Sequence, residues 1–290
     1  MSRQPMRSKR KLSHYDLGRT PYFAVQSDPR FSYCLYVPPD YRRKGRTKFH
    51  LAVIVHGTRR TAEQYRDAFV GFAQRHRCIV LTPLFPRVAD EPQGLDGFKQ
   101  ARVGDTRYDL VLLDMVDEVA ERYRVRADRF LLHGFSGGGQ FVHRFFYLHP
   151  ERLMAVSIGA PGAVTLLDRD QDWWCGVRDF EAQFGQVLDY GKMRRVPVQM
   201  VIGAKDTRER RVKIRPASPL WMEGANAPGR NRRERLRALR ASFRRAGIRV
   251  RYDVVPGVGH DGRQVLRPVK AFFADTLAAW RESRRLRRTA

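Results

Sequence analysis

The sequence has few cysteines and no long hydrophobic run. Its 290 residues include three cysteines, Cys34, Cys78 and Cys175, and these lack the spacing of a metal site. An odd, sparse set of this kind is typical of reduced thiols in a cytosolic protein, so we expect no disulfide framework and no metal. No segment approaches the roughly 18 consecutive apolar residues of a membrane span. A membrane-spanning helix is therefore not expected.

The basic amino-terminal segment has no apolar core. Residues 1–20 read MSRQPMRSKRKLSHYDLGRT and lack the apolar stretch and the small-residue cleavage site of a secretory signal peptide. We therefore expect a cytoplasmic protein. Residues 1–25 are interpreted as a basic, flexible arm. Residues 26–290 are interpreted as a single domain, because their length and 42% hydrophobic content suffice for one α/β core.

Acidic residues are scarce relative to basic ones. There are 30 Asp and Glu against 56 Lys and Arg, which gives a formal net charge of +26. Such an excess suits a polyanion partner, because Lys and Arg neutralise phosphates. However, no C2H2 spacing, RNP-like string or GxxxxGK[ST] loop accompanies it, and arginine excess also arises from coding drift. We favour a solvated surface, and a nucleic-acid partner stays open but is not favoured. The basic residues are spread over 42–46, 205–215, 230–245 and 281–288.

Apolar, β-branched runs alternate with amphipathic helical patterns along most of the chain. This alternation predicts βαβ units with right-handed crossovers, and hence a mostly parallel, doubly wound sheet flanked by helices. Residues 162–193 break the alternation, are too long for a simple connection, and are interpreted as a cap-like insertion over the active site. We expect strands at 31–41, 50–57, 78–83, 129–134, 153–161, 196–206 and 248–260, and helices at 61–77, 108–123, 138–150, 233–247 and 265–285.

One serine lies between glycines at a predicted turn from strand to helix. The segment GFSGG, residues 134–138, matches G-x-S-x-G, the nucleophile elbow. A turn this sharp forces the serine into an unfavourable backbone region, and flanking glycines remove the clashes that side chains would make. The hydroxyl of Ser136 would then be exposed above the sheet. The alternative is a plain glycine-rich turn with an idle serine.

A serine nucleophile needs a base, and the base needs an orienting carboxylate. Asp206 and His260 each follow a predicted strand, in the order Ser, Asp, His that this arrangement requires. Ligands in such sheets bind outside the carboxyl ends of the strands, where both residues are expected. Asp253, inside a strand, and Asp261, next to His260, are weaker choices for the acid. The remaining histidines considered are interpreted as core or surface residues: His76, His133, His143 and His149.

An acyl-transfer site also needs hydrogen-bond donors for the developing oxyanion. We expect the backbone N–H groups of Gly137 and Thr58 to form this oxyanion hole, with His56 bracing the turn before Thr58. Arg59 is a candidate for contact with a substrate carboxylate, and a solvated arginine is the alternative. Trp173 and Trp174 are candidates for a pocket wall, although aromatic residues of a cap equally often form its core.

The order HGTRRTAEQY, HGFSGGG, GAKD and GVGH resembles that of an α/β-hydrolase over about residues 30–280. Within that superfamily, HGTRRTAEQY and the later tryptophan-bearing insertion are similar to the polyhydroxybutyrate depolymerase and feruloyl-esterase-like branch. The resemblance implies a cofactor-free serine hydrolase that forms an acyl-enzyme, with Ser136, Asp206 and His260 as its triad. The chain departs from secreted members in its lack of a signal peptide and of paired cysteines, which argues against an extracellular polymer as substrate.

These observations together predict a carboxylic ester hydrolase that acts on a small-molecule ester with a small or medium acyl group. A peptidase of the same fold is the nearest alternative, because the triad does not distinguish esters from amides. A basic protein that binds nucleic acid or an acidic partner on a hydrolase scaffold is the alternative from a different class.

Overall fold

A computed structural model describes residues 12–45, 48–87, 97–209 and 212–289 of the chain. The strands are β1 (Gly18–Arg19), β2 (Phe23–Ala24), β3 (Ser32–Val37), β4 (Phe49–Val55), β5 (Cys78–Leu84), β6 (Arg102–Val103), β7 (Thr106–Arg107), β8 (Val125–Phe135), β9 (Leu153–Gly159), β10 (Val198–Gly203) and β11 (Val250–Val255). The α-helices are α1 (Ala62–Ala68), α2 (Val70–His76), α3 (Tyr108–Arg122), α4 (Gly137–Leu148), α5 (Phe180–Phe184), α6 (Tyr190–Met193), α7 (Arg232–Arg245) and α8 (Leu266–Thr289).

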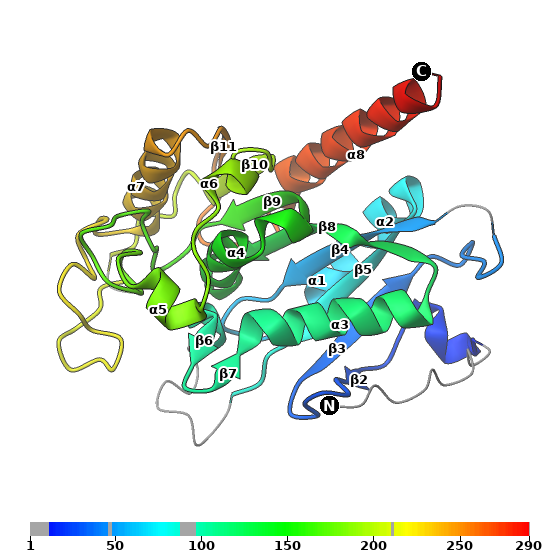
Figure 1. The fold of residues 1–290 in the computed structure, drawn as a ribbon, viewed down its shortest axis with the longest axis horizontal. Coiled ribbons are helices and arrows are strands. Elements are labelled where there is room, and N and C mark those ends of the chain that lie inside the picture. Colours follow the sequence, from blue (N-terminus) through cyan, green and yellow to red (C-terminus); the bar gives the residue numbers. More distant parts are fainter. Residues whose placement is uncertain (1–11, 46–47, 88–96, 210–211, 290) are drawn as a thin grey trace.

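A mixed, mostly parallel sheet runs through the molecule (Figure 1). Its strand order is β1-β3-β5-β4-β8-β9-β10-β11, and β2 also pairs with β3. The strands from β5 to β11 in this order are parallel, whereas β1, β2 and β5 each pair with β3 in antiparallel fashion. The predicted fold class, a mostly parallel sheet flanked by helices, is confirmed.

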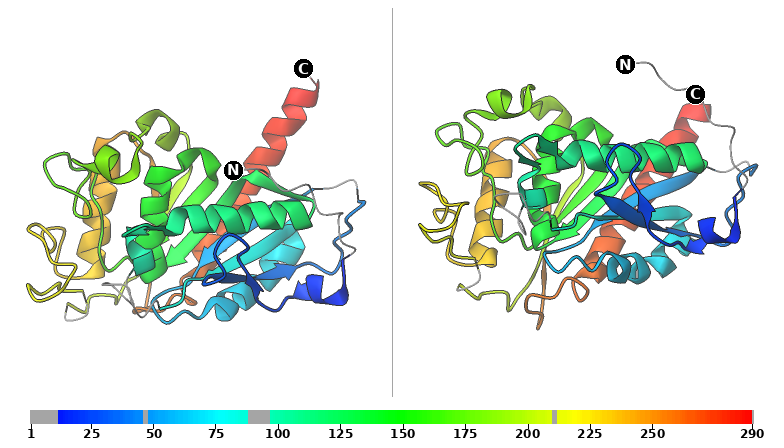
Figure 2. Two further views of the ribbon diagram at one scale, coloured as in Figure 1. Left: turned by 60° about the horizontal axis from the view of Figure 1, so that its bottom comes forward. Right: turned by 90° about the horizontal axis from the view of Figure 1, so that it is seen from below.

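Helices cover both faces of the sheet (Figure 2). On one face α3 and α4 lie against the central strands, and Phe146 of α4 packs on Phe243 of α7 with 5.6 Å between ring centroids. On the other face lie α1, α2 and α8, where Phe72 of α2 lies near Phe273 of α8. The apolar β4 and β9 are buried along their whole length, as strands covered on both faces must be. The carboxyl-terminal part of α8 projects from the body of the molecule (Figure 1).

The structure differs from the sequence analysis in the segment assigned to the amino-terminal arm. Residues 18–19 and 23–24 form β1 and β2 on the antiparallel edge of the sheet, and Val25 is fully buried. Two-residue strands carry no periodic pattern, so the sequence gives no signal for them. The first eleven residues of the expected arm lie outside the described residues. The predicted helix 61–77 is divided at Phe69 into α1 and α2.

The irregular segments at 162–193 and 207–231 pack against each other. The first contains α5 and α6 and corresponds to the predicted insertion; the second, between β10 and α7, was not singled out from the sequence. Trp174 and Cys175 of the first segment form a small buried cluster with Ala225 of the second. The indole N–H of Trp174 also donates to the carbonyl of Leu220. The two segments are thus packed into one unit, which we call the cover.

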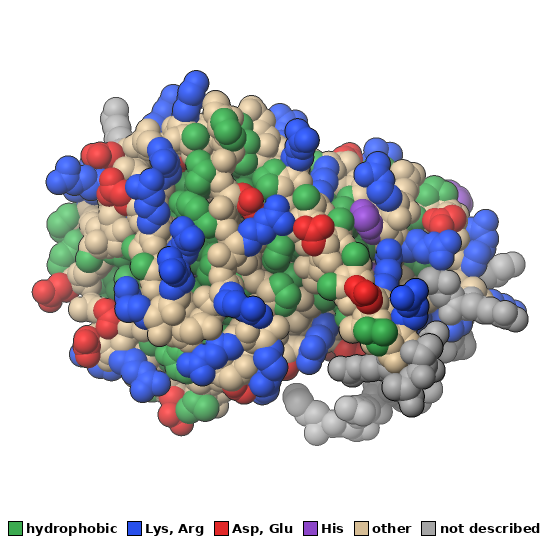
Figure 3. Space-filling model, turned by 90° about the horizontal axis from the view of Figure 1, so that it is seen from above, with side chains coloured by type: hydrophobic (Ala, Val, Ile, Leu, Met, Phe, Trp, Pro, Cys, Tyr) green, Lys and Arg blue, Asp and Glu red, His purple; other side chains and the backbone are tan. Residues whose placement is uncertain are grey.

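Other expectations from composition can be compared with the described residues. The three cysteines are buried and free, as expected for reduced thiols. None of the described helices is long and apolar enough to cross a membrane. No group of three potential metal ligands occurs in the described part of the chain. Figure 3 shows Lys and Arg side chains dispersed over one face of the molecule rather than gathered in one patch.

Candidate active site

Ser136 lies in the sharp turn between β8 and α4. Its φ of 58° and ψ of −113° are strained for a residue with a side chain, and they turn the hydroxyl out of the path of the chain. The turn is tightly packed, because a Cβ on Gly138 would lie 2.5 Å from the carbonyl oxygen of Val55 in β4. A Cβ on Gly134 would likewise collide with the backbone of Gly138. The glycines therefore permit the close approach of α4 to the sheet.

The imidazole of His260 lies between Ser136 and Asp206. Its Nε2 is 2.9 Å from Oγ of Ser136, and its Nδ1 is 2.6 Å from Oδ2 of Asp206. With an ionised Asp206, Nδ1 carries the proton and donates to the carboxylate, which leaves Nε2 to accept from the serine hydroxyl. Loops after β8, β10 and β11 supply the three residues, so parallel strands bring together positions that are far apart in sequence.

Asp206 is almost completely buried, with a side-chain exposure of 1%, whereas the side chain of His260 is 26% exposed. Oδ1 of Asp206 makes no hydrogen bond among the described residues, but the guanidinium of Arg232 lies 3.7 Å from it. Arg232 is itself buried at the start of α7. This arginine partly neutralises the carboxylate and limits its movement. Sequence reasoning missed it, because it lies in a long arginine-rich run with nothing to mark it.

The two alternative acids bind elsewhere. Asp253 of β11 accepts hydrogen bonds from Gln199 and Arg251 through Oδ2, at 2.6 and 3.0 Å. Asp261 accepts from the backbone N–H groups of Arg263 and Gln264, and so closes the turn after His260. Neither carboxylate contacts the imidazole of His260, and Asp206 is the acid that does.

The loop after β4 lies directly beside the residue that follows Ser136. A Cβ on Gly137 would be 3.1 Å from both the backbone nitrogen and Oγ1 of Thr58. The two backbone N–H groups expected to form the oxyanion hole therefore belong to adjacent pieces of chain. Gly137 is also the first residue of α4, where the helix dipole favours negative charge.

His56 braces this loop. Its Nδ1 donates to the carbonyl oxygen of Gly57 at 2.8 Å, and its Nε2 accepts from the backbone N–H of Phe85 at 3.0 Å. Complete burial lowers the pKa of His56 to about 4, which keeps the imidazole neutral and able to accept. These hydrogen bonds join the end of β4 to the end of β5, and they thereby fix the position of the loop that contains Thr58.

Lys99 is a second residue that sequence reasoning missed. It belongs to a short 3-10 helix, Gly97–Gln100, and is 7% exposed. Its Cε would be 3.0 Å from a Cβ on Gly137, so its aliphatic stem lies against the turn that carries Ser136. No strand or helix is expected from the sequence between residues 83 and 108, and nothing in the pattern of this stretch indicates the contact.

No protein-family model and no curated protein sequence matches this chain. Solved structures do resemble it. The poly(3-hydroxybutyrate) depolymerase from Bordetella parapertussis superimposes with a TM-score of 0.68 at 24% identity, over 84% of each chain. The poly(aspartic acid) hydrolase-1 from Sphingomonas sp. KT-1 has a TM-score of 0.66 at 22% identity, over 83% of this chain and 92% of that one. A ferulic acid esterase has a TM-score of 0.59 at 14% identity, over 88% and 96%.

The chain has the α/β-hydrolase fold. The predicted resemblance is thereby confirmed at the level of the fold, and the two branches suggested from the sequence are among the similar structures. All three identities lie below 25%, so the likeness establishes the architecture and leaves activity and substrate to the site itself.

Within this fold, Ser136, Asp206 and His260 line an open cleft of about 690 Å³. Arg59 lines the cleft, next to Thr58. The acidic side chains that line it are Asp206, which is held by His260, and Asp261, which closes a turn. The cleft is therefore rich in positive charge. Its basic lining residues are Arg59, Lys205, Arg208, Arg232 and Arg263.

Trp173 and Trp174, by contrast, are not among the residues that line this cleft. The ring of Trp173 packs on Phe180 and Phe184 of the insertion, with centroids 5.8 and 4.8 Å away. Trp174 is 7% exposed and belongs to the cluster between the two irregular segments. Of the two interpretations left open by the sequence, these contacts favour the core of the cover over a wall of the substrate pocket.

The guanidinium of the buried Arg144 lies near both tryptophan rings. It is 5.7 Å from the ring centroid of Trp173 and 5.5 Å from that of Trp174, and its Nε donates to Oγ1 of Thr165. Burial lowers the pKa of Arg144 to about 9. Since Arg144 lies on α4, it links the insertion to the helix that begins directly after Ser136.

Proposed function

We propose that this protein is a serine hydrolase that cleaves carboxylic esters through a Ser136–His260–Asp206 triad and an acyl-enzyme intermediate. The observation that carries the proposal is the position of His260, with one ring nitrogen 2.9 Å from Oγ of Ser136 and the other 2.6 Å from Oδ2 of Asp206. A strained serine turn and two neighbouring backbone N–H groups support it.

In the acylation step, Nε2 of His260 takes the hydroxyl proton of Ser136 as Oγ attacks the ester carbonyl. The carbonyl oxygen becomes an oxyanion, which accepts hydrogen bonds from the backbone N–H groups of Gly137 and Thr58. The protonated imidazole is stabilised by Asp206. Its proton then passes to the leaving alcohol as the tetrahedral intermediate collapses to the acyl-enzyme.

Deacylation repeats these steps with water as the nucleophile. Nε2 of His260 takes a proton from water, hydroxide attacks the acyl carbon, and the returned proton restores the hydroxyl of Ser136. The partial exposure of His260 gives water access to this position. The acid leaves, and the cycle ends with the free enzyme.

The lining of the cleft favours a small ester that carries negative charge. Arg59 stands next to Thr58, so it would contact a substituent close to the carbonyl being attacked. Guanidinium groups bind carboxylates through paired hydrogen bonds, which would orient such a substrate.

Hydrolysis of p-nitrophenyl esters of graded acyl length is the experiment that tests the proposal. Wild type should release p-nitrophenol, and Ser136→Ala should lower kcat by more than about 10⁴-fold, since the nucleophile is lost. Ser218→Ala, a serine outside the cleft, is the matched control and should retain wild-type rates. Equal rates for wild type and Ser136→Ala would contradict the proposal.

A peptidase activity at the same site is the alternative within this chemistry. The triad attacks amides by the same route, so p-nitroanilides with the same acyl groups form the discriminating comparison. A kcat/KM for the anilide within about tenfold of that for the ester would assign the protein to the peptidases, and a far lower value would support the esterase proposal.

A further inference from the structure

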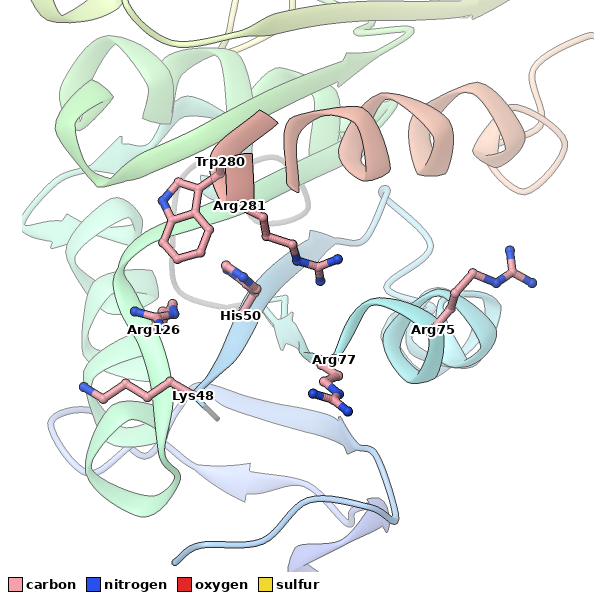
Figure 4. Close-up of a pocket in the computed structure, with 7 residues that line it drawn as sticks. All are labelled: Lys48, His50, Arg75, Arg77, Arg126, Trp280 and Arg281. Atoms are coloured by element: carbon pink, nitrogen blue, oxygen red, sulfur yellow. The ribbon is translucent and has the colours of Figure 1, made fainter. Parts of the chain in front are cut away.

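A second hollow, of about 550 Å³, lies at the amino ends of the parallel strands, and Figure 4 shows the residues that line it. His50 is at the beginning of β4, Arg77 directly precedes β5, and Arg126 is near the beginning of β8. These positions are at the amino ends of parallel strands, whereas the triad follows their carboxyl ends. The remaining wall comes from α2, from α8 and from Lys48, which directly precedes β4. The full lining is Lys48, His50, Arg75, Arg77, Arg126, Trp280 and Arg281.

Five of the seven lining side chains are cationic, and no Asp or Glu among the described residues lines the hollow. Lys48, Arg75, Arg77 and Arg281 form no ion pair with a carboxylate of the described chain. Glu282 lines an adjoining hollow with Arg281 and Arg285, outside this one. Like charges around one cavity repel each other, and a bound anion would reduce that repulsion.

Several of these groups are held in position before any ligand binds. The guanidinium of Arg281 donates to the carbonyl oxygen of His76 at 2.9 Å. Arg126 lies 4.9 Å from the ring centroid of Trp280, whose edge meets the imidazole of His50. Cation–π contact and packing therefore fix the guanidinium of Arg126 next to the hollow.

Arg77 occupies a backbone position that normally favours glycine. It ends α2 with φ 54° and ψ 57°, in the left-handed region, and its carbonyl accepts from the backbone N–H of His50. The arginine thus lies in a backbone conformation that a glycine would adopt at lower energetic cost. Figure 4 shows Arg77 on the other side of His50 from Trp280 and Arg126, with its guanidinium turned outward, so the cations lie around the rim of the hollow rather than along one wall.

We propose that this hollow binds a compact oligophosphate, a chain of two or three phosphate groups, either free or at the end of a nucleotide. Arginines on several sides suit the many oxygens of such a chain, because guanidinium groups bind phosphate oxygens in pairs. The volume lies in the range of small-ligand sites. The ring of Trp280 is already flanked by Arg126 and Arg284, so no aromatic face is reserved for a base.

Isothermal titration of the full chain with sodium tripolyphosphate at about 150 mM salt tests this site, since that salt screens scattered surface charges. Wild type should bind one equivalent. Arg77→Gln/Arg281→Gln should weaken binding at least about tenfold, because two paired contacts are lost. The matched control, Arg244→Gln/Arg245→Gln on the exposed side of α7, changes the net charge equally and should alter the affinity by less than about twofold.

The readouts separate a binding defect from a folding defect. The double variant should keep the wild-type rate of ester hydrolysis and its unliganded Tm, because the hollow lies at the other end of the parallel strands from Ser136. If it does not, Arg281→Gln alone, on the exposed surface of α8, takes its place and should still weaken binding. The inference is independent of the proposed esterase activity, so either can fail without the other.

Titration with ATP identifies the source of the phosphate chain. Equal affinity for ATP and tripolyphosphate assigns the site to the phosphate chain alone, whereas tighter ATP binding assigns it to nucleotides. No heat of binding at 1 mM tripolyphosphate, or equal weakening by both double variants, would overturn the proposal. It would also be overturned if a 20-base-pair DNA duplex bound through Arg77 and Arg281 while tripolyphosphate did not, since the site would then belong to nucleic acid.

Discussion

The two carboxylate oxygens of Asp206 face different partners. Oδ2 accepts from His260, whereas Oδ1 faces the guanidinium of Arg232. An aspartate in this position fixes the imidazole in the tautomer that leaves Nε2 free for the serine, and it stabilises the imidazolium that forms during the reaction. Burial of the carboxylate strengthens both effects, because little water competes for it.

Replacing Asp206 with asparagine should therefore impair catalysis without unfolding the protein. An amide N–H facing Nδ1 favours the wrong tautomer of His260, and we expect kcat/KM for p-nitrophenyl esters to fall on the order of 10³–10⁴-fold. Continuous assays of p-nitrophenol release at pH 8 measure kcat/KM, and circular dichroism checks that the variant is folded.

Asp261→Asn is the matched control at the neighbouring carboxylate. Because Asp261 bonds to backbone N–H groups and not to His260, its loss should lower kcat/KM less than about tenfold. A larger loss in Asp261→Asn than in Asp206→Asn would contradict the assignment of the orienting role to Asp206.

At the scale of elements, the junction of β8 and α4 determines how the hydroxyl of Ser136 is placed. The helix starts so close to β4 that Gly138 has no room for a methyl group, with the carbonyl of Val55 at 2.5 Å from a Cβ. Backbone atoms on both sides prevent an easy adjustment, because they belong to buried strands.

Gly138→Ala should displace the start of α4 and lower the free energy of unfolding by about 1–3 kcal/mol, the usual effect of overpacking. The kcat for ester hydrolysis should also fall in the fraction of protein that stays folded, since the backbone N–H of Gly137 moves with the helix. Urea unfolding and kcat measure the two effects.

Gly71→Ala in α2 is the control for a glycine in an open helical position. A Cβ there has nothing within 4 Å, so alanine should stabilise the protein by up to about 1 kcal/mol through its higher helix propensity. If Gly138→Ala behaved like Gly71→Ala, the steric account of the serine turn would be contradicted.

The long periodic elements could be predicted from the sequence, because burial on both faces or on one face leaves a pattern over several residues. The buried runs that became β4 and β9, and the helix that became α3, are of this kind. The order of Ser136, Asp206 and His260 was readable for the same reason, since each follows a recognisable strand.

What the sequence left open depends on contacts between distant segments. The edge strands β1 and β2 gain their place by pairing with β3 and by contacts of Arg19 with Asp67 and of Phe23 with Arg122, and the segment 207–231 is irregular. The positions of Arg232 and Lys99 depend on tertiary packing, which the spacing of charged residues in the sequence does not predict. The burial of Trp174 likewise results from its contact with Ala225 in another segment.

At the scale of the whole molecule, buried neutral histidines couple stability to pH. Burial lowers the pKa of His50, His56 and His133 to about 4, and that of His143 well below its ordinary value. In the unfolded chain the same groups titrate near 6.5. As the pH falls through 6.5 the unfolded state takes up protons first, so stability is complete above that pH and is lost toward pH 4.

We therefore expect the free energy of unfolding to decrease steeply between pH 6.5 and 4. Each of the histidines with a pKa of about 4 contributes about 3 kcal/mol over this window, a large part of the ~5–15 kcal/mol typical of a domain. Urea unfolding at half-unit pH intervals measures the slope.

His133→Leu removes one of the four groups and should reduce the slope by about 1.4 kcal/mol per pH unit. His133 is suitable because its Nε2 is buried without a hydrogen-bond partner among the described residues, and the variant loses the contacts that Nδ1 makes with Ser157. An unchanged slope in this variant, or a flat wild-type profile across the window, would contradict the expectation.

The central claim is that Ser136 is an activated nucleophile within the α/β-hydrolase fold. The most direct measurement is labelling of the intact protein with a fluorophosphonate, followed by peptide mapping by mass spectrometry. A serine activated by His260 should be labelled stoichiometrically, on Ser136 alone, and the label should be absent from Ser136→Ala and strongly slowed in Asp206→Asn. No labelling of the wild type, or labelling at another serine, would contradict the claim.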